Sequence, residues 1–335
     1  MRVPFSWLAE YVPGVTTDMR ALESLLSMSG TKVEAVHDVG VPQSGNGNAA
    51  GFRVGRVVSY EQHPNADRLR LCQVDVGEGA ARQIVCGASN FQEGDTVAVV
   101  LPGATMPGGF EITTAKLRGV ESHGMMLSER ELELSTDHSG IMILPEGIEP
   151  GTALSEVVPI GDTVFELEIT PNRPDCLGVM GVAREVAAVV DADLNDDIWS
   201  VDAVAGAAGN VEDHVSVAIE APDLCSRYMA RAFVDVQVGP SPLWLRARLA
   251  AAGMRAINNV VDVTNYVMLL TGQPLHAFDA DRIEGGSITV RRAHEGEHVT
   301  TLDDVQRTLE PWMLSISDAS PVSYTHLTLP TILLV

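Results

Sequence analysis

The amino-acid sequence predicts a multi-domain α+β protein, in which a β-barrel is inserted into a small N-terminal α/β domain and a second α/β domain follows. Its 335 residues allow about two or three domains, each of roughly 100–200 residues. Short apolar segments separated by glycine- and proline-rich turns fill residues 51–158, which is typical of a small barrel or a sandwich. Helical spacing of apolar residues recurs on both sides of that segment, at 19–26, 178–190 and 241–253.

The small α/β domain is expected to combine residues 1–45 with residues 159–200. Leucines recur at helical spacing directly after Thr17 and Asp18, a pair that favours a helix start. The stretch GVPQSGNGNAAG then marks a domain boundary, because it is rich in glycine, asparagine and serine. A short strand, the turn TPNRPDC and the helix 178–190 are expected to pack back onto the first residues, which makes the barrel an insertion.

Residues 46–158 are expected to form the barrel, of the OB type. In the strand RLRLCQVDV the apolar side switches from Leu69 and Leu71 to Cys72 and Val74. Because side chains alternate strictly along a regular strand, this change of phase predicts a bulge, as in the strongly bent strands of a small closed barrel.

The distribution of charge singles out the same segment. The chain has 22 basic and 45 acidic side chains, a formal net charge of −23 that should repel nucleic acid. Residues 51–130 are nearly neutral, with eight basic and nine acidic side chains, so only this segment is expected to face a polyanion. OB barrels bind RNA with a positive groove and polar loop groups. Arg68 and Arg70 are expected to project from one strand face and Arg118 to lie in a glycine-flanked loop; ordinary solvated strand charges are the alternative.

The segment 205–321 is expected to form the second α/β domain. Its predicted elements are the strand VSVAIE, the helical runs SPLWLRARLAAAG and INNVVDVTNYVMLLTG, the loop QPLHAFD and the strand ITVRRA. Gly253 and Gly272 follow the two helical runs, where helix C-caps favour glycine.

Several classes of protein are excluded by what the sequence lacks. The motifs GxxxxGK[ST], GxGxxG and GxSxG are absent, so nucleotide binding or hydrolysis by those routes is not expected. Four cysteines without CxxC spacing predict small buried apolar side chains rather than a zinc site or disulfides. The chain has no apolar run long enough to cross a bilayer and no secretion signal, so a cytoplasmic location is expected.

The last residues differ in character from the rest. Residues 319–335 carry no charge, and the string VSYTHLTLPT resembles an in-frame translation of a sequencing-library adaptor. We therefore expect residues 322–335 to be a non-native tail and the natural protein to be longer; an apolar edge strand is the alternative.

Three long motifs of the barrel, HPNADRLRLCQVDVG, QIVCGASN and KLRGVESHGMMLSERELEL, resemble the tRNA-binding OB domain. The flanking segments MRVPFSWLAEYV, FELEITPNRPDCLGVMGVAREVAA and SPLWLRARLAAAGMRAINNVVDVTNYVMLLTGQPLHAFD resemble one family that carries this domain, the beta subunits of bacterial phenylalanyl-tRNA synthetase. The resemblance covers residues 1–321. It implies that this barrel contacts tRNA(Phe), and the residues we expect to do so are Arg68, Arg70, Lys116, Arg118, Ser122 and His123.

The resemblance also implies a hydrolytic editing site after residue 200, which removes tyrosine wrongly attached to tRNA(Phe). His276 in QPLHAFD matches the histidine of that site, where a neutral imidazole can orient or activate a water molecule. A histidine that only bonds loop backbone is the alternative, and Asp262, Asn265 and Asp279 are expected to be caps and turn formers. The family's remaining editing residues and its magnesium-binding carboxylates lie beyond residue 321, so only a partial editing site and no metal site are expected here.

As a beta subunit, the protein would work in an α2β2 heterotetramer, with aminoacylation on the alpha subunit. ATP and magnesium are expected for the full assembly, and no cofactor for this chain alone. The rival interpretations are a non-catalytic tRNA-binding module or chaperone, and a free-standing hydrolase that acts on mischarged tRNA.

Overall fold

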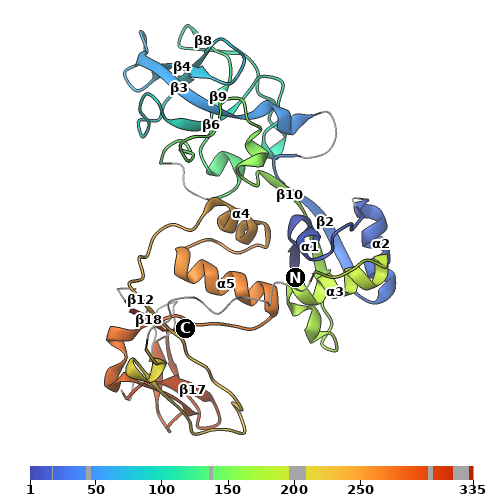
Figure 1. Ribbon diagram of the computed structural model, residues 1–335, viewed down its shortest axis with the longest axis vertical. Helices are drawn as coiled ribbons and strands as arrows, with labels where there is room; N and C mark the ends of the chain where they lie inside the picture. Colours follow the sequence, from blue (N-terminus) through green and yellow to red (C-terminus); the bar gives the residue numbers. More distant parts are fainter. Residues whose placement is uncertain are drawn as a thin grey trace. The chain divides into compact units, whose positions relative to one another are not determined.

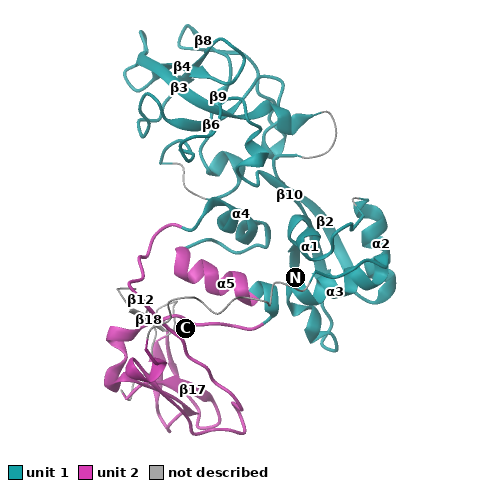
Figure 2. Cartoon of the chain, viewed as in Figure 1, with its two compact units in different colours: residues 1–196, 241–257, 269–272 teal, residues 197–240, 258–268, 273–335 magenta. Residues whose placement is uncertain are grey.

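The computed structural model describes residues 1–16, 18–42, 47–135, 139–195, 209–300, 305–319 and 332–334. They form two compact units (Figure 2): residues 1–196, 241–257 and 269–272, and residues 197–240, 258–268 and 273–335. Both units contain helices and strands, so the predicted mixed α and β architecture is confirmed. Within the described ranges, no helix combines the length and the apolar character needed to span a bilayer.

The chain of the first unit begins with a small antiparallel sheet, in the order β1-β10-β2, that packs with three helices (Figure 1). These elements are β1 (Arg2–Pro4), α1 (Phe5–Tyr11), α2 (Met19–Ser29), β2 (Lys32–Gly40), β10 (Gly161–Glu168) and α3 (Val179–Val190). Trp7 and Leu8 of α1, Leu22 of α2 and Phe165 of β10 are fully buried. The predicted helix at 178–190 is thereby confirmed.

Strands β2 and β10 are neighbours in this sheet, although the strands of the barrel lie between them in the sequence. The chain leaves this sheet after β2 and returns to it at the start of β10, and the two crossings lie side by side. The Val41 amide donates a hydrogen bond to the Ile160 carbonyl there, at 2.8 Å. Gly40 is needed there: its φ is +71°, and a Cβ would lie 2.4 Å from the same carbonyl oxygen.

Helix α2 starts where the sequence predicts and continues to Ser29. The Asp18 carboxylate accepts hydrogen bonds from the amides of Arg20 and Ala21, both at 3.1 Å, and so caps the helix N-terminus. Gly30 closes the other end with a φ of +105°, a conformation that costs glycine little.

Residues 52–126 form a nearly closed, barrel-like sheet in the order β5-β4-β3-β6-β9, with a separate β7-β8 hairpin. The strands are β3 (Phe52–Gln62), β4 (Arg70–Asp75), β5 (Arg82–Cys86), β6 (Thr96–Val100), β7 (Ala115–Leu117), β8 (Val120–Ser122) and β9 (Met125–Met126). The edge strand β5 is tied back to the segment after β8 by the hydrogen bond from the His123 amide to the Gln83 carbonyl, at 2.8 Å. Gly124 lies at this closure with a φ of +141°.

Alternate side chains of the barrel strands enter two apolar clusters. Val97 and Val99 of β6 face one cluster, together with Val74 of β4, whereas Ala98 and Val100 face the other. Residue 55 must be glycine because a Cβ there would approach the Val99 and Val74 side chains to 2.7 and 2.8 Å. Strand β6 is therefore buried on both faces, which explains its uninterrupted apolar sequence.

The predicted bulge exists but in the partner strand, so its predicted location was wrong. Strand β4 begins only at Arg70 and alternates regularly, with Cys72 and Val74 buried. The register shifts in β3 instead: Val57 pairs with Val74 and Ser59 with Gln73, which leaves Val58 unpaired. Leu69 precedes the strand, so the apparent change of phase in RLRLCQVDV reflects a turn followed by a strand.

The second unit contains the sheets β11-β14-β17 and β12-β18-β13, the hairpin β15-β16 and most of α5. Its elements are β11 (Ser216–Ile219), β12 (Ala232–Val234), α5 (Asn259–Thr271), β13 (Phe278–Asp279), β14 (Ser287–Arg292), β15 (His298–Thr300), β16 (Gln306–Thr308), β17 (Leu314–Ser317) and β18 (Ile332–Leu334). Helix α4 (Leu243–Ala251) belongs to the first unit. Gly253 and Gly272 have φ values of +85° and +76°, as expected beyond the ends of α4 and α5.

Most of the predicted non-native tail, residues 322–331 and 335, lies outside the described residues. Within it, β18 pairs antiparallel with β12 and β13. The non-native origin of the tail stays a prediction, as do the domain boundaries proposed above.

Candidate functional site

The predicted RNA-facing residues fall into two groups, exposed cations and engaged side chains. Arg68 is exposed, but it lies in the turn between β3 and β4 and not on a strand. The expectation that Arg68 and Arg70 share one strand face was therefore wrong. Arg70 is the first residue of β4 and is half-buried.

Arg70 is held in place by aromatic side chains. Its guanidinium lies 4.5 Å from the ring centroid of Tyr60 and 5.1 Å from that of Phe91, and it donates a hydrogen bond to the Phe91 carbonyl at 3.2 Å. The two rings meet edge to face, 5.5 Å apart. This cation–π cluster gives Arg70 a structural role that its charge alone did not indicate in the sequence.

Lys116 and Arg118 are exposed on the hairpin formed by β7 and β8. Lys116 pairs in register with Glu121, and Leu117 with Val120, so Arg118 and Gly119 form the two-residue turn. Their φ values are +48° and +96°, and positive values at both central residues define a type I′ turn.

The turn that carries Arg68 contacts this hairpin through two side chains. His63 is buried, and its Nε2 lies 3.1 Å from the Leu117 carbonyl oxygen. Asn65 donates from Nδ2 to the Arg118 carbonyl at 3.0 Å. Two segments far apart in the sequence are thus joined, and we call their exposed basic side chains, Arg68, Lys116 and Arg118, the cation cluster.

Ser122 and His123 differ from the cation cluster in exposure. Ser122 is only 3% exposed; its hydroxyl accepts a hydrogen bond from the Val85 amide at 3.0 Å and donates one to the Gly124 carbonyl at 2.9 Å. Because the single hydroxyl proton is already used, Ser122 cannot donate to a phosphate without breaking this bond. His123 is half-exposed, with Nε2 3.9 Å from a carboxylate oxygen of Glu121. Ser122 is therefore excluded from the surface that we propose below.

His276 lies in the second unit, in the loop after α5, and is exposed. Its ring meets that of Phe278 edge to face, with centroids 4.5 Å apart. Partial desolvation of the ring lowers the pKa of His276 below its ordinary value, which favours the neutral imidazole at pH 7. A neutral imidazole can accept a proton from water, as a hydrolytic role requires.

The acidic and amide residues near His276 in sequence only partly follow the prediction. Asp279 is a cap: its carboxylate accepts from the Asp281 amide at 3.1 Å. Asp262 lies in the first turn of α5 and Asn265 in its interior, so neither caps the helix and their assignment as caps was wrong. The cap is Asn258, whose Oδ1 accepts hydrogen bonds from the amides of Val260 and Val261.

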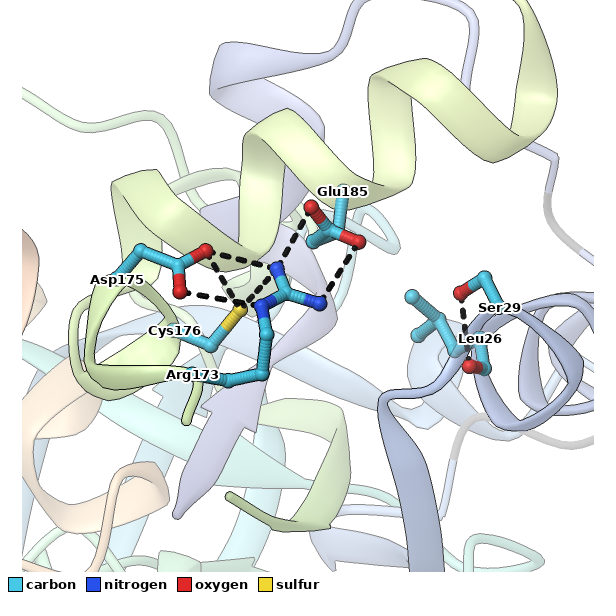
Figure 3. A network of polar contacts seen from close by, with 6 residues as sticks. All are labelled: Leu26, Ser29, Arg173, Asp175, Cys176 and Glu185. Carbon is cyan, nitrogen blue, oxygen red and sulfur yellow. Dashed lines mark hydrogen bonds and ion pairs between the residues drawn. The ribbon is translucent and has the colours of Figure 1, made fainter. Parts of the chain in front are cut away.

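A third polar cluster lies in the turn TPNRPDC of the first unit (Figure 3). Arg173 bonds Asp175 through two nitrogens, at 3.1 and 2.7 Å, and Glu185 of α3 at 2.7 Å. The same guanidinium lies 3.0 Å from the buried Cys176 sulfur. Arginine lowers the pKa of the Asp175 carboxyl to about 2, and burial raises the pKa of the Cys176 thiol to about 11. The network fastens the turn to α3 and leaves Cys176 without thiolate character.

The other cysteines follow the prediction in part. Cys72 and Cys86 are buried in the barrel, as expected of small apolar side chains, whereas Cys225 is only half-buried. Among the described residues, no three histidine, cysteine or acidic side chains are grouped so that they could hold a metal ion.

Comparison with known proteins finds two domain families in this chain. A family model for a tRNA binding domain matches residues 52–153, and a model for the B3/4 domain matches residues 224–327. The phenylalanine–tRNA ligase beta subunit of Symbiobacterium thermophilum is 48% identical over 323 residues, and that of Anaeromyxobacter dehalogenans 46% over 321 residues. Each alignment covers 95% of this chain. The chain belongs to the phenylalanine–tRNA ligase beta-subunit family.

This chain aligns with only part of the length of these beta subunits. The chain spans 35% of the Symbiobacterium protein and 38% of the Anaeromyxobacter protein. Among solved structures, the C-terminal domain of Plasmodium vivax p43 aligns with 30% of this chain and 56% of its own, at 29% identity and a TM-score of 0.23. In the beta-subunit framework, the cation cluster falls within the tRNA binding domain and His276 within the B3/4 domain.

The loop–hairpin contact is a feature that our sequence analysis missed. The motif HPNAD separates two expected strands and carries part of the resemblance, but His63 and Asn65 are not among the residues expected to contact RNA. The residue types of His63 and Asn65 do indicate hydrogen bonding, since polar side chains in a proline-containing turn commonly bond nearby backbone. The partner carbonyls lie more than fifty residues away, however, and no local pattern identifies them.

Proposed function

We propose that this chain is the part of a phenylalanine–tRNA ligase beta subunit that binds tRNA(Phe) through its barrel and supplies part of a site that hydrolyses mischarged Tyr-tRNA(Phe). The observation that carries the proposal is the 48% identity to such a beta subunit over 95% of the chain. Aminoacylation would take place on the alpha subunit of an α2β2 assembly, with ATP and magnesium as requirements of that assembly.

The barrel is proposed to be an OB fold that contacts tRNA through the cation cluster. Arg68, Lys116 and Arg118 are exposed, and two of them lie on the separate β7-β8 hairpin. The net negative charge of the chain repels RNA. Contacts with RNA should therefore be concentrated in residues 51–130, where basic and acidic side chains are nearly balanced in number. Such contacts read the shape and backbone of folded RNA more than its sequence.

The second unit is proposed to carry the hydrolytic function through His276. A pocket that accepts the phenyl ring of phenylalanine rejects tyrosine only modestly, because tyrosine adds a single hydroxyl, so a second site is required to remove the error. Water would attack the ester carbonyl and break its bond to the ribose oxygen, which leaves with a proton as a hydroxyl. The neutral imidazole of His276 would take the proton from the attacking water and return it to the leaving oxygen.

The test of tRNA binding uses the full-length beta subunit assembled with its alpha partner. Replacing Arg68, Lys116 and Arg118 with alanine should weaken tRNA binding and make its salt dependence shallower, by about 0.7–0.9 in slope for each lost phosphate contact. Arg82→Ala is the matched control, because Arg82 already pairs with Glu78 at 2.7 Å. Unchanged affinity in the triple variant would remove the cation cluster from the RNA interface.

The test of hydrolysis uses the same assembly with His276→Ala. Charging of tRNA with phenylalanine should remain near normal, while Tyr-tRNA(Phe) should persist in a deacylation assay. Normal deacylation would assign His276 a structural role. If tRNA binding survives but no deacylation depends on this unit, the alternative function, a non-catalytic tRNA-binding module or chaperone, becomes the better assignment.

A further inference from the structure

We infer that His63 and Asn65 are positioning residues for RNA recognition: they fix the hairpin that presents Lys116 and Arg118. The inference rests on the proposed binding of tRNA by the cation cluster. It assigns a role to the motif HPNAD, whose side chains do not themselves belong to that cluster.

The hairpin has little to stabilise its shape by itself. Strand β7 is three residues long and wholly exposed, and an isolated two-stranded hairpin is at best marginally stable in water. Its turn places Arg118 at a φ of +48°, a left-handed conformation that is strained for any residue with a Cβ. Strand β8 is held to β5 at Gln83, whose Nε2 donates to the Glu121 carbonyl at 2.8 Å and whose carbonyl accepts from the His123 amide at 2.8 Å. Strand β7 and the turn need contacts of their own to keep one conformation.

His63 provides the first contact. It is 2% exposed, and its Nδ1 accepts a hydrogen bond from the Asn65 amide at 3.1 Å. Because Nδ1 accepts, the ring proton is assigned to Nε2, which donates to the Leu117 carbonyl at 3.1 Å. Both ring nitrogens are thus used, one to shape the turn 63–69 and the other to hold β7.

Asn65 provides the second contact, directly at the strained turn. Its Nδ2 donates to the Arg118 carbonyl at 3.0 Å, and a Cβ on Gly119 would lie 3.5 Å from the same nitrogen. The side chain therefore packs over both central residues of the turn. The bond fixes the peptide plane that follows Arg118 and with it the direction in which the arginine leaves the backbone.

Fixing the hairpin before binding should increase affinity, because cations that are ordered in advance lose less conformational entropy when they meet phosphates. The structure therefore predicts that an uncharged side chain controls an electrostatic interaction. A residue that supported only the fold would change stability without changing the number of phosphate contacts.

The experiment compares Asn65→Ala with the double variant Lys116→Ala/Arg118→Ala in the assembled synthetase, by measuring tRNA affinity from about 50 to 200 mM salt. Asn65→Ala should weaken binding and flatten the salt dependence, although it removes no charge. Combined with the double variant it should have almost no further effect, since the cations that it positions are already gone.

Asn90→Ala is the matched control. Asn90 also bonds backbone within the barrel, donating to the Ile141 carbonyl at 2.9 Å and accepting from the Ile141 amide at 3.0 Å, and it does not touch the hairpin. It should leave the salt slope unchanged even if it lowers stability. If Asn65→Ala fails to fold, Asn65→Leu tests the same contact and should give the same flattened salt slope, since leucine fills a similar volume and lacks the Nδ2 donor to the Arg118 carbonyl.

The outcomes separate the two proposals. If the double variant binds tRNA as the unchanged protein does, the proposed RNA surface fails. If the double variant binds weakly while Asn65→Ala keeps the wild-type slope, or if their effects simply add, the positioning role is overturned and the RNA surface stands.

Discussion

Ser122 tests whether a side chain whose hydrogen bonds are already made within the barrel contributes to RNA binding. Its hydroxyl accepts from the Val85 amide at 3.0 Å and donates to the Gly124 carbonyl at 2.9 Å, at the point where the sheet nearly closes. Ser122→Ala leaves that buried amide, on a residue only 7% exposed, without its partner. The loss of such a bond costs about 1–3 kcal/mol, so the Val85 amide should exchange with solvent about 5- to 150-fold faster.

Hydrogen exchange resolved at individual amides is the appropriate assay, because it reports on the barrel separately from the other parts of the chain. Ser59→Ala, at a half-exposed position in β3, is the control and should change stability by no more than about 0.5 kcal/mol. The tRNA affinity of Ser122→Ala should keep its normal salt slope. Unchanged protection of Val85 together with weakened tRNA binding would refute this reasoning and return Ser122 to the RNA surface.

Three further predictions follow from the geometry. Gly124→Ala should lower the free energy of unfolding by at least about 1 kcal/mol in urea titrations, because a Cβ would lie 2.7 Å from a carbonyl oxygen of β6 at a φ of +141°. Because Arg173 lowers the pKa of Asp175 to about 2, below the value of about 4 in an unfolded chain, the contribution of this pair to stability should be present above pH 4 and be lost as the pH falls toward 2; Asp175→Asn should remove this part of the pH dependence of Tm. Iodoacetamide at pH 8 should label the half-buried Cys225 well before Cys72, whose pKa burial raises to about 12, as peptide mass spectrometry can show.

The helices show how far local sequence signals extend. Asp18 and Gly30 delimit α2 because a capping carboxylate and a left-handed glycine act on backbone groups within a few residues. Helix α3 was located instead by the helical spacing of its apolar residues; no side chain caps its N-terminus, and Asp191 follows it with a φ of +53°. For α5 the wrong residues were assigned as caps: Asp262 and Asn265 lie inside the helix, and Asn258, one residue before it, is the cap. Residue type alone does not distinguish between neighbouring polar positions at a helix start.

The barrel shows where local signals stop. The pattern of residues 51–158 predicted short strands and a barrel, since alternation and turn residues are properties of each segment by itself. The bulge was assigned to β4 although it lies in β3, because the register between two strands depends on both of them. A single strand cannot show which of the two partners carries the extra residue.

The sequence by itself determined the family, the mixed architecture, the approximate positions of α2, α3, α4 and α5, and the segment in which basic and acidic residues are nearly balanced in number. Only the tertiary structure decided which polar side chains of that segment are free. Arg70 stacks on Tyr60 and Phe91 and Ser122 bonds across the barrel closure, whereas Lys116 and Arg118 stay exposed. The physical reason is that exposure and hydrogen-bond partners are set by contacts between segments distant in the chain, and composition, spacing and periodicity record only what is near.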